Sequence, residues 1–553
     1  MRMPRLIHAT FVLLALLAGA SCVHSGSTTG DHRDLPAGPP ALALVPADTP
    51  YAFAMLAPMD AGLQEKLFAR AARMLDKNDA QIRAALGDKS VAAGRLLGAW
   101  LDEVHGNLSP AGMVKLGLNP NGRMVAYGVS FFPVLRVDIG DPAVLHATVL
   151  RVLTKAQIQV EEKHAGAQAY WQIDDDKVSI VIAIVGHELV FSLATTAGLG
   201  DLLPHVFGQV KPKQSLADTG VLRQLASAHH YDGGVVGFVD FDAMARLVFG
   251  ETPSPVALPF LSEAGAMSAP CKKEIHRLIG YAPRLIFGTE KMTATETVFS
   301  LTLATVPAIS HALAGLSRPI AGLSLQPGDA PPLAVFGIGL NVGDGVTVLR
   351  RSAAAVLAEP FECPELTALN DAARDLDQQL AHALPPMVTS LNGIVVTLDE
   401  LDLKASPPKV SGGALLVGEG AGDLLRQGLA FLAPGQANGL AADGRPVALS
   451  LASHGIPGVD QAYVGLKADR AAMAVGTAAS QRVVSLLGAS APAHAPLMVL
   501  AIDLARLMKI VPEMAGKMAD SPFASGDDLG FAAYGIEADG ELGVTLRVSQ
   551  QTK

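Results

Sequence analysis

Apolar runs separated by short polar turns dominate the pattern of this chain. Two β-rich runs, residues 177–185 and 189–193, flank Gly186-His187-Glu188, and this arrangement predicts a β-hairpin. Residues 292–304 alternate threonine and glutamate with apolar residues, as expected of a strand with one solvated face. The most apolar stretch, residues 178–197, contains the same polar turn, so nothing beyond the N-terminus predicts a transmembrane helix.

Helical periodicity follows several of these strands. Asp141 before Pro142 predicts a helix start, because aspartate caps the first turn and proline suits the first helical position. The apolar face of that helix is expected to contain Leu145, Val149, Leu150 and Leu153. Residues 64–75 and Ser485-Leu486 are further helical candidates. Hairpins outnumber β-α-β crossovers, so we predict an α+β fold of antiparallel or mixed sheets with helices on one face.

The same segments recur along the chain in the same order, which predicts two tandem copies of one module. Pro46-Ala47-Asp48-Thr49-Pro50 and the apolar strand after it recur as Pro327-Gly328-Asp329-Ala330-Pro331 and its strand. Later matches pair Gly140-Asp141 with Gly422-Asp423, Phe238 to Phe241 with Ala501 to Leu504, and Leu301 to Leu303 with Val544 to Leu546. The offset between matches only shrinks, whereas chance matches would scatter. The predicted boundaries lie near residues 42–310 and 320–553.

The N-terminus has the layout of a secretory signal: two arginines, an apolar core from Leu6 to Ala20, and small residues. With Cys22 directly after Gly19-Ala20-Ser21, this stretch resembles the lipobox of bacterial lipoproteins. The resemblance implies that residues 1–21 are removed and that Cys22 carries the lipid, with acyl chains such as palmitate. The usual box has leucine where Gly19 stands. An ordinary cleaved signal and an uncleaved anchor are the alternatives.

Residues 22–41 hold small and polar residues with little apolar content, which predicts a flexible tether after the lipidated cysteine. In lipoproteins an aspartate after the cysteine often retains the protein in the inner membrane. Val23 stands there, so the resemblance points to the outer membrane, facing the periplasm or the cell surface. The opening at residues 46–50, the signal and strands ending in Val-Asp also resemble a family of uncharacterised bacterial envelope proteins. That resemblance implies architecture and no activity.

Composition narrows the function classes. Of 553 residues, 50% are apolar and 17% are charged, against about 25% charged in typical domains. The surplus suits a well-filled core and permits an apolar face that meets a partner or a lipid-like ligand. The net charge of −10 is spread without a basic block, which argues against a nucleic-acid partner. Cys271 and Cys363 are the cysteines left after Cys22, and they form either a disulfide or two separate thiols.

Several motifs could carry chemistry, and each also has a structural interpretation. Residues 418–422 lie where a phosphate loop would lie but lack its glycine spacing, so we predict a structural turn. His229-His230 and Asp174-Asp175-Asp176 could bind metal ions, but they lack ligand spacing and predict solvated loops. Asp240 and Asp503 recur before helices and predict helix caps rather than a shared acidic site. The aromatic residues Trp100, Trp171 and Phe131-Phe132 predict core rather than a ligand site.

We predict a non-enzymatic, lipid-anchored envelope protein that binds a partner or scaffolds an assembly. The alternative is a carrier or chaperone for a lipid-like apolar ligand, and a hydrolase acting on envelope polymer is less favoured. No nucleophile elbow and no zinc-binding His-Glu-x-x-His motif occurs in the sequence. No catalytic, cofactor or metal-binding residues are therefore predicted.

Overall fold

The computed structural model describes residues 38–58, 61–85, 92–175, 178–256, 267–321, 323, 331–382, 384–432, 435, 439–451, 459–492, 496–511 and 530–551. Cys22, the predicted signal and the tether up to residue 37 lie outside these ranges. None of the helices in these ranges combines the length and the apolar content needed to cross a membrane.

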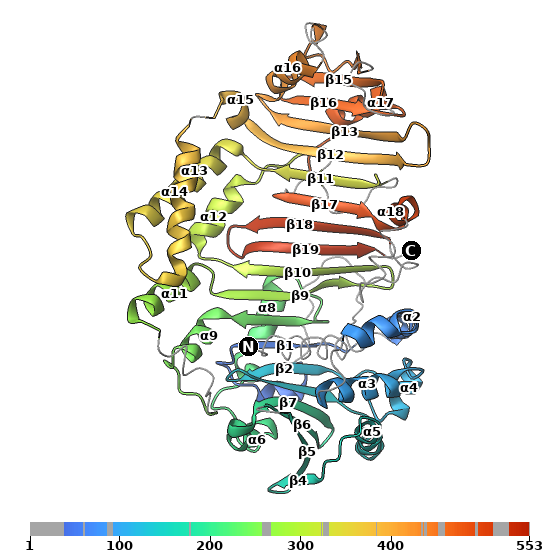
Figure 1. Ribbon diagram of the computed structural model, residues 1–553, viewed down its shortest axis with the longest axis vertical. Helices are drawn as coiled ribbons and strands as arrows, with labels where there is room; N and C mark the ends of the chain where they lie inside the picture. The colour runs from blue at the N-terminus through green and yellow to red at the C-terminus, as the bar shows by residue number, and fades with distance from the viewer. Residues whose placement is uncertain are drawn as a thin grey trace. The chain divides into compact units, whose positions relative to one another are not determined.

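The chain forms two compact units. Of the described residues, those up to 267 and those in 283–301 belong to unit 1, and those in 268–282 and from 302 onward belong to unit 2. Both units combine helices with antiparallel strands, which confirms the predicted α+β class (Figure 1).

Unit 1 contains a sheet in which every described pairing is antiparallel. Its strands are β1 (Tyr51–Ala54), β2 (Met124–Val129), β3 (Phe132–Asp138), β4 (Glu162–Ala165), β5 (Gln168–Asp175), β6 (Val178–Val185), β7 (Glu188–Thr195), β8 (Val236–Asp240), β9 (Arg284–Met292) and the first part of β10 (Glu296–Ala304). They lie in the order β4-β5-β6-β7-β3-β2-β1-β8-β9. The helices are α2 (Ala61–Ala85), α3 (Ala92–Val104), α4 (Pro110–Lys115), α5 (Pro142–Lys155), α6 (Leu199–Val206), α7 (Leu216–Thr219), α8 (Val221–Ala228) and α9 (Phe241–Val248), with 3-10 turns η1 (Pro40–Leu44) and η2 (Thr196–Gly198).

Unit 2 also contains an antiparallel sheet. Its strands are β11 (Ala334–Gly339), β12 (Leu391–Asp402), β13 (Lys409–Gly418), β14 (Val447–Ser450), β15 (Gln461–Lys467), β16 (Arg470–Val475), β17 (Met498–Asp503), β18 (Phe531–Asp539) and β19 (Gly543–Gln551). They lie in the order β14-β15-β16-β13-β12-β11-β17-β18-β19. The helices are α11 (Ala269–Tyr281), α12 (Pro307–Leu316), α13 (Val342–Ala358), α14 (Thr367–Ala381), α15 (Pro386–Thr389), α16 (Ala421–Leu432), α17 (Ala479–Gly488) and α18 (Leu504–Ile510), with the 3-10 turn η4 (Pro364–Leu366).

Helices pack on both faces of the sheet of unit 2, so the expectation of one helical face is wrong. Leu415 and Leu416 are neighbours on β13 and point to opposite faces. Leu415 belongs to the cluster around Val483 and Leu486 of α17. Leu416 packs instead into the cluster that includes Leu429 of α16. Consecutive apolar residues on a strand point to opposite faces of the sheet, so both faces must be buried. At β13, α17 buries one face and α16 buries the other.

Two local predictions in unit 1 are confirmed. β6 and β7 form a hairpin across Gly186, with Val185 paired to Glu188. Asp141 caps α5, since its carboxylate accepts hydrogen bonds from the backbone N–H groups of Ala143 and Val144 at 2.8 and 3.1 Å. The third prediction, the apolar face of α5, fails at one position.

Leu145, Val149 and Leu153 are buried, whereas Leu150 is exposed. On a helix, Leu150 lies about 100° from Val149, and this places it outside the buried stripe formed by Leu145, Thr148, Val149, Val152 and Leu153.

The chain is already packed at residue 38, within the segment predicted to be a tether up to residue 41. Ala41 and Leu42 are buried in η1, and Arg123 donates a hydrogen bond to the main-chain oxygen of Gly38 at 2.9 Å. Burial of Ala41 and Leu42 therefore packs the 3-10 turn η1 against unit 1, so the predicted tether is too long at its C-terminal end.

A buried arginine joins β3 to its surroundings in unit 1. Arg136 is 1% exposed and pairs with the carboxylate of Glu188 on β7. Its other nitrogens donate to the main-chain oxygen of Val206 at 2.5 Å and to the hydroxyl of Tyr127 at 3.4 Å. Val206 ends α6, where the helix dipole favours a cation. Nothing in the sequence pattern marked this residue.

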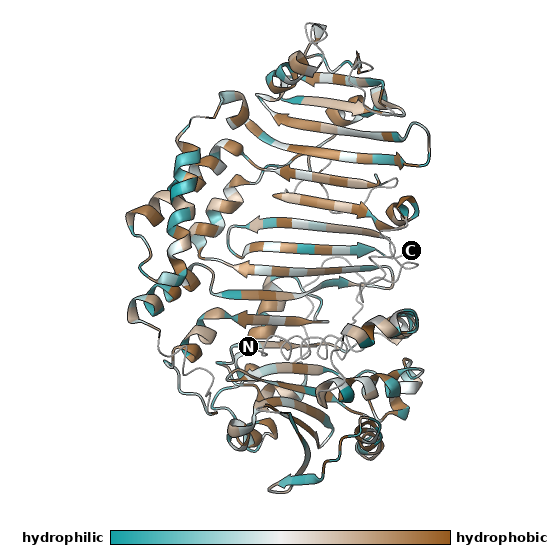
Figure 2. Ribbon diagram, in the orientation of Figure 1, coloured by the Kyte–Doolittle hydropathy of each residue, from teal (hydrophilic) through white to brown (hydrophobic). Residues whose placement is uncertain are grey.

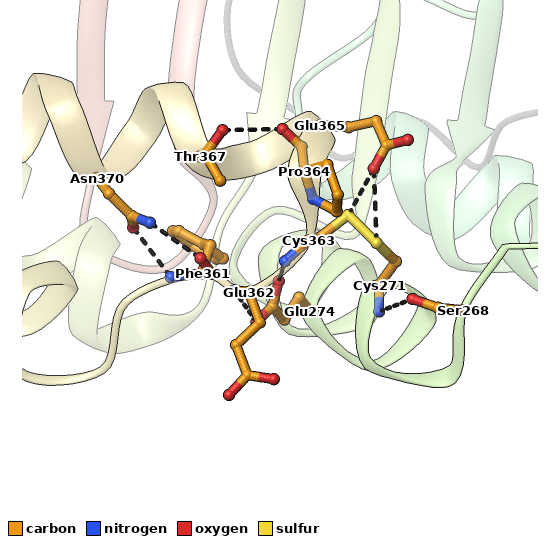
Figure 3. Close-up of a disulfide and its surroundings, with 10 residues drawn as sticks. All are labelled: Ser268, Cys271, Glu274, Phe361, Glu362, Cys363, Pro364, Glu365, Thr367 and Asn370. Carbon is orange, nitrogen blue, oxygen red and sulfur yellow. Dashed lines mark hydrogen bonds between the residues drawn. A yellow bond between two sulfur atoms is a disulfide. The ribbon is translucent and has the colours of Figure 1, made fainter.

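Unit 2 contains a disulfide between Cys271 on α11 and Cys363 before η4 (Figure 3). Their Cα atoms lie 4.7 Å apart, inside the usual range for a bridge. Of the two alternatives that the sequence left open, the structure contains the bridged form. The carboxylate of Glu274 accepts hydrogen bonds from the backbone N–H groups of Glu362 and Cys363 at 2.8 and 3.0 Å, so the bridged loop is also held non-covalently.

Candidate functional site

One face of the sheet of unit 2 exposes a row of large apolar side chains. Phe336 on β11 lies directly opposite Val396 on β12 and Leu500 on β17. Leu500 in turn lies opposite Tyr534 on β18. Directly paired residues in an antiparallel sheet point to the same face with Cβ atoms about 5 Å apart. The four side chains therefore form a continuous row across β12, β11, β17 and β18. We call this side of the sheet, over these four strands and β19, the open face.

The rows on either side are apolar as well. One row holds Ile394, Ile338, Met498, Ile536 and Leu546, and the other holds Leu398, Ala334, Ile502, Ala532 and Gln550. Val548 on β19 lies opposite Tyr534 and extends the row of Phe336 to a fifth strand. Gln550 is the single polar residue in these three rows, and no charged side chain lies in them.

The exposure of the row shows that the face is uncovered. Phe336, Val396, Leu500, Tyr534 and Leu546 are each between 36% and 41% exposed. Cross-strand neighbours flank each of these side chains on both sides, so this much exposure requires an open space above the sheet. At roughly 200 Å² per large side chain, the five present roughly 400 Å² of surface. Such a patch is within the size range that often marks an interaction site.

The opposite face of the same strands is a conventional core. Val335, Val395, Val499 and Ala501, which alternate with residues of the open face, are buried in the cluster with Leu486 and Leu487 of α17. Strands β11 and β17 are therefore apolar at nearly every position, as their brown colour in Figure 2 shows. Antiparallel sheets with one solvated face alternate apolar and polar residues. These two strands have the composition of strands buried on both faces.

Neighbouring strands show how such a face is normally covered. Over β13, β16 and β15 the same side of the sheet carries Leu416, Met473 and Val464, and these residues pack against α16. The cover reaches Leu391 at the start of β12 but not Val396, which is exposed, whereas Val464 on β15 is fully buried. The open face is thus the uncovered continuation of a face that is covered over β13 to β15.

In unit 1, phenylalanine rings on β1 and β9 pack against each other across the intervening strand β8. Phe53 on β1 lies opposite Gly237 on β8, which lies opposite Phe287 on β9. The glycine leaves a gap that the two rings fill, with their centroids 6.3 Å apart. A Cβ atom at Gly237 would lie 2.5 Å from the ring of Phe287. Phe299 continues the group at 6.4 Å from Phe287.

A polar cavity of about 510 Å³ lies on the α17 side of the sheet of unit 2. Arg482 on α17 donates to the carboxylate of Asp399 at 2.7 Å, and Arg506 on α18 donates to the main-chain oxygen of Asp399 at the same distance. Burial raises the pKa of the Asp399 carboxyl, and the two guanidinium groups oppose that shift. Both arginines bind Asp399, Arg482 through the carboxylate and Arg506 through the main-chain oxygen, so the cluster holds β12 to two helices.

A second polar cavity, of about 360 Å³, lies in unit 1 beside α9. Its Asp240 binds Arg284 at 2.7 Å, and the guanidinium of Arg284 lies 5.1 Å from the ring centre of Phe238. Asp240 also caps α9 by accepting a hydrogen bond from the N–H group of Ala243. Asp503 caps α18 in the same way, with the N–H group of Arg506 as donor. The capping interpretation of both aspartates is confirmed.

A test of the capping role follows from this geometry. Asp503→Ala should destabilise unit 2 by about 1 kcal/mol, whereas Asp503→Asn should change its stability by less than about 0.5 kcal/mol, because asparagine caps helices equally well. Urea unfolding of both variants measures the difference. Equal losses for the two variants would show that the charge matters and that the cap does not.

The solvated loops predicted for the histidine pair and the acidic run are found only in part. His229 is buried and stacks on Tyr231 at 5.4 Å, while His230 has a left-handed backbone with φ of 57°. Asp174 and Asp175 belong to strand β5. Hydrogen bonds from Ser179 and Gln172 lower the pKa of Asp174. Asp176, the third residue of that acidic run, lies outside the described residues. Residues 418–422 form the turn from β13 into α16.

The aromatic candidates divide between core and partial exposure. Trp171 and Phe132 are buried, and Trp100 packs against the core cluster of α3 and α5. Within the described ranges, one group of three residues has metal-binding atoms close together: Cys271, Cys363 and Glu365. Both of its sulfur atoms belong to the disulfide, so this group offers no thiolate in the structure described.

Sequence reasoning missed the residues of the open face. The available signal was the lack of alternation in residues 333–338, which were recognised only as an apolar strand, and in residues 498–502. The pairing of Phe336 with Val396 and Leu500 joins segments that are far apart in the chain. The chain matches no protein-family model, no curated protein and no solved structure.

Proposed function

We propose that this chain is a non-enzymatic, lipid-anchored envelope protein that binds a protein partner through the open face of unit 2. The observation that carries the proposal is the row Val396, Phe336, Leu500 and Tyr534. At these four strands the sheet of unit 2 is apolar on both sides, but only the side opposite the row is covered. Exposed apolar surface favours association because its burial releases about 25 cal/mol per Å².

A protein surface suits this face better than a lipid-like ligand. Ligand sites enclose most of the surface of a small molecule in a concave, mostly apolar pocket. The open face is instead made of neighbouring side chains on a sheet, and the two cavities described above are lined largely by polar and charged residues. Flat apolar patches with a polar border are typical of protein interfaces.

The anchor completes the proposal. Cys22 with its lipid would hold the chain at the outer membrane, and the segment before residue 38 would tether the folded units. The low content of charged residues, 17%, is consistent with a protein that keeps apolar surface for a partner.

We also propose that the two units are copies of one module. The strand order β5-β6-β7-β3-β2-β1-β8-β9 in unit 1 corresponds element by element to β14-β15-β16-β13-β12-β11-β17-β18 in unit 2. Helices follow corresponding strands: α5 and α16, α6 and α17, and α9 and α18. An edge strand, β4, is present in unit 1 alone among the described strands. An identical order of eight antiparallel strands supports duplication because many other orders are compatible with the rules of sheet topology.

Site-specific photo-crosslinking in intact cells tests the binding proposal. A photoreactive phenylalanine derivative replaces Tyr534 on the open face, and the control replaces Phe431, which is 87% exposed on α16 and lies off this face. We expect a crosslinked protein product from position 534 and not from position 431. Introducing Phe336→Lys should remove the product, because a lysine in the middle of the row would have to be desolvated on binding.

Two outcomes would contradict the proposal. A product of equal yield from both positions would show that contact does not depend on the open face. The second outcome is no protein product from position 534 together with lipid recovered from the purified chain, which would favour the carrier function. Cys22→Ala, expressed in parallel, should lower the yield if the anchor brings the chain to its partner.

A further inference from the structure

We infer that the partner on the open face is a second copy of the same chain, packed sheet against sheet about a twofold axis. This inference rests on the proposed function and names the partner. Twofold dimers are the commonest assemblies of soluble proteins, and they require a surface that is complementary to itself. The open face meets that requirement in shape, in charge and in area.

The shape combines projections and recesses on the same strands. On β11, Phe336 stands next to the partly exposed Ala334 on the open face, and on β18, Tyr534 stands next to Ala532, which is buried. An aromatic ring beside an alanine gives each face both a projection and a recess about 7 Å apart along the strand. A twofold rotation places the aromatic rings of one copy over the alanines of the other. Two such faces would then interdigitate at the spacing of about 10 Å that is usual for packed sheets.

The charge distribution permits two identical faces to meet. The chain has a net charge of −10, so two copies repel each other where charged surfaces come together. None of the three rows contains a charged side chain. The ion pair between Arg547 and Glu537, on adjacent strands β19 and β18, involves positions that alternate with those rows and belong to the other side of the sheet. The surface that each of the two copies contributes to the dimer interface would therefore carry no charged side chain.

The area is sufficient for a specific dimer. The five most exposed side chains supply roughly 400 Å² per copy. The partly exposed residues of the flanking rows, Ile394, Ile338, Met498 and Ile536 among them, raise this to roughly 600 Å². Two copies would bury roughly 1,200 Å², which is the lower limit for specific, stable interfaces. A dimer with a measurable dissociation constant is expected, rather than an obligate one.

Sedimentation velocity over a concentration series of the purified full-length chain, in density-matched detergent, tests the inference. We expect reversible association to a dimer. Phe336→Lys should weaken the dimer by roughly 100-fold, because the twofold axis places the substitution in the interface twice. Phe431→Lys makes the same change at an exposed position off the face and should leave the dissociation constant unchanged.

The folded state of the variant is checked independently. Phe336 is exposed, so Phe336→Lys should retain the circular dichroism spectrum and the thermal unfolding profile of the unsubstituted chain. Association with an unchanged constant in Phe336→Lys would overturn the inference, as would a monomer at every concentration.

The two proposals fail in distinguishable ways. A monomeric purified chain that still crosslinks to a different protein from position 534 would overturn the twofold dimer and leave the proposed function standing. A monomer without any crosslinked protein from position 534 would overturn both. A crosslinked product with twice the mass of the chain, lost in Phe336→Lys, would support both.

Discussion

Arg136→Met should destabilise unit 1 by about 3–5 kcal/mol, the usual cost of removing one member of a buried ion pair. Methionine retains the apolar part of the side chain and removes the guanidinium. The carboxylate of Glu188 then loses its cation, and the main-chain oxygen of Val206 loses its donor. The two tryptophans, Trp100 and Trp171, both lie in unit 1, so urea unfolding followed by tryptophan fluorescence reports on this unit alone.

Two further variants separate the cause from a general effect of losing an arginine. Arg246→Met removes an exposed ion pair with Asp242 and should cost less than about 1 kcal/mol. In the Arg136→Met background, Glu188→Gln should restore part of the lost stability, because the uncompensated charge is gone. The buried ion pair does not stabilise unit 1 in this way if Arg136→Met lowers the free energy of unfolding no more than Arg246→Met does. The same conclusion follows if adding Glu188→Gln to Arg136→Met lowers it further.

Local features of the fold were predictable because their determinants lie within a few residues. The β6–β7 hairpin required only two apolar runs and the turn at Gly186, and the start of α5 required only Asp141 and Pro142. Leu150 was misplaced because periodicity alone does not decide where an apolar stripe ends. The aspartate caps at residues 240 and 503 were predicted for the same local reason as the cap of α5.

The candidate site depended on pairings that no local pattern contains. Phe336 reaches the open face through its register with residues 60 and 164 positions further along the chain, Val396 and Leu500. A short apolar strand can be buried on both faces or can expose one of them, and the sequence is the same in both cases. Arg136 was missed for a related reason: its partners come from β7, from the end of α6 and from β2.

The second large effect concerns the disulfide of unit 2. Cys271→Ala combined with Cys363→Ala should lower the stability of unit 2 by about 4–5 kcal/mol on the chain-entropy model, because the bridge closes a loop of 92 residues. For a unit of this size the melting temperature should fall by roughly 10 °C. Unit 2 contains no tryptophan. Its unfolding transition is therefore the calorimetric one that has no counterpart in a thermal scan followed by tryptophan fluorescence.

The native structure of the double variant should be nearly unchanged, because the loop has other contacts. Glu274 still accepts two backbone hydrogen bonds, and Arg277 still pairs with Glu359 at 2.8 Å and lies over the ring of Phe361. The loss should therefore act through the unfolded chain, which gains freedom once the bridge is absent. A reducing agent should bring the unsubstituted chain to the stability of the double variant and leave the double variant unaffected. Equal melting temperatures of unit 2 with and without the bridge would refute this account, since a loop of this length has to cost entropy to close.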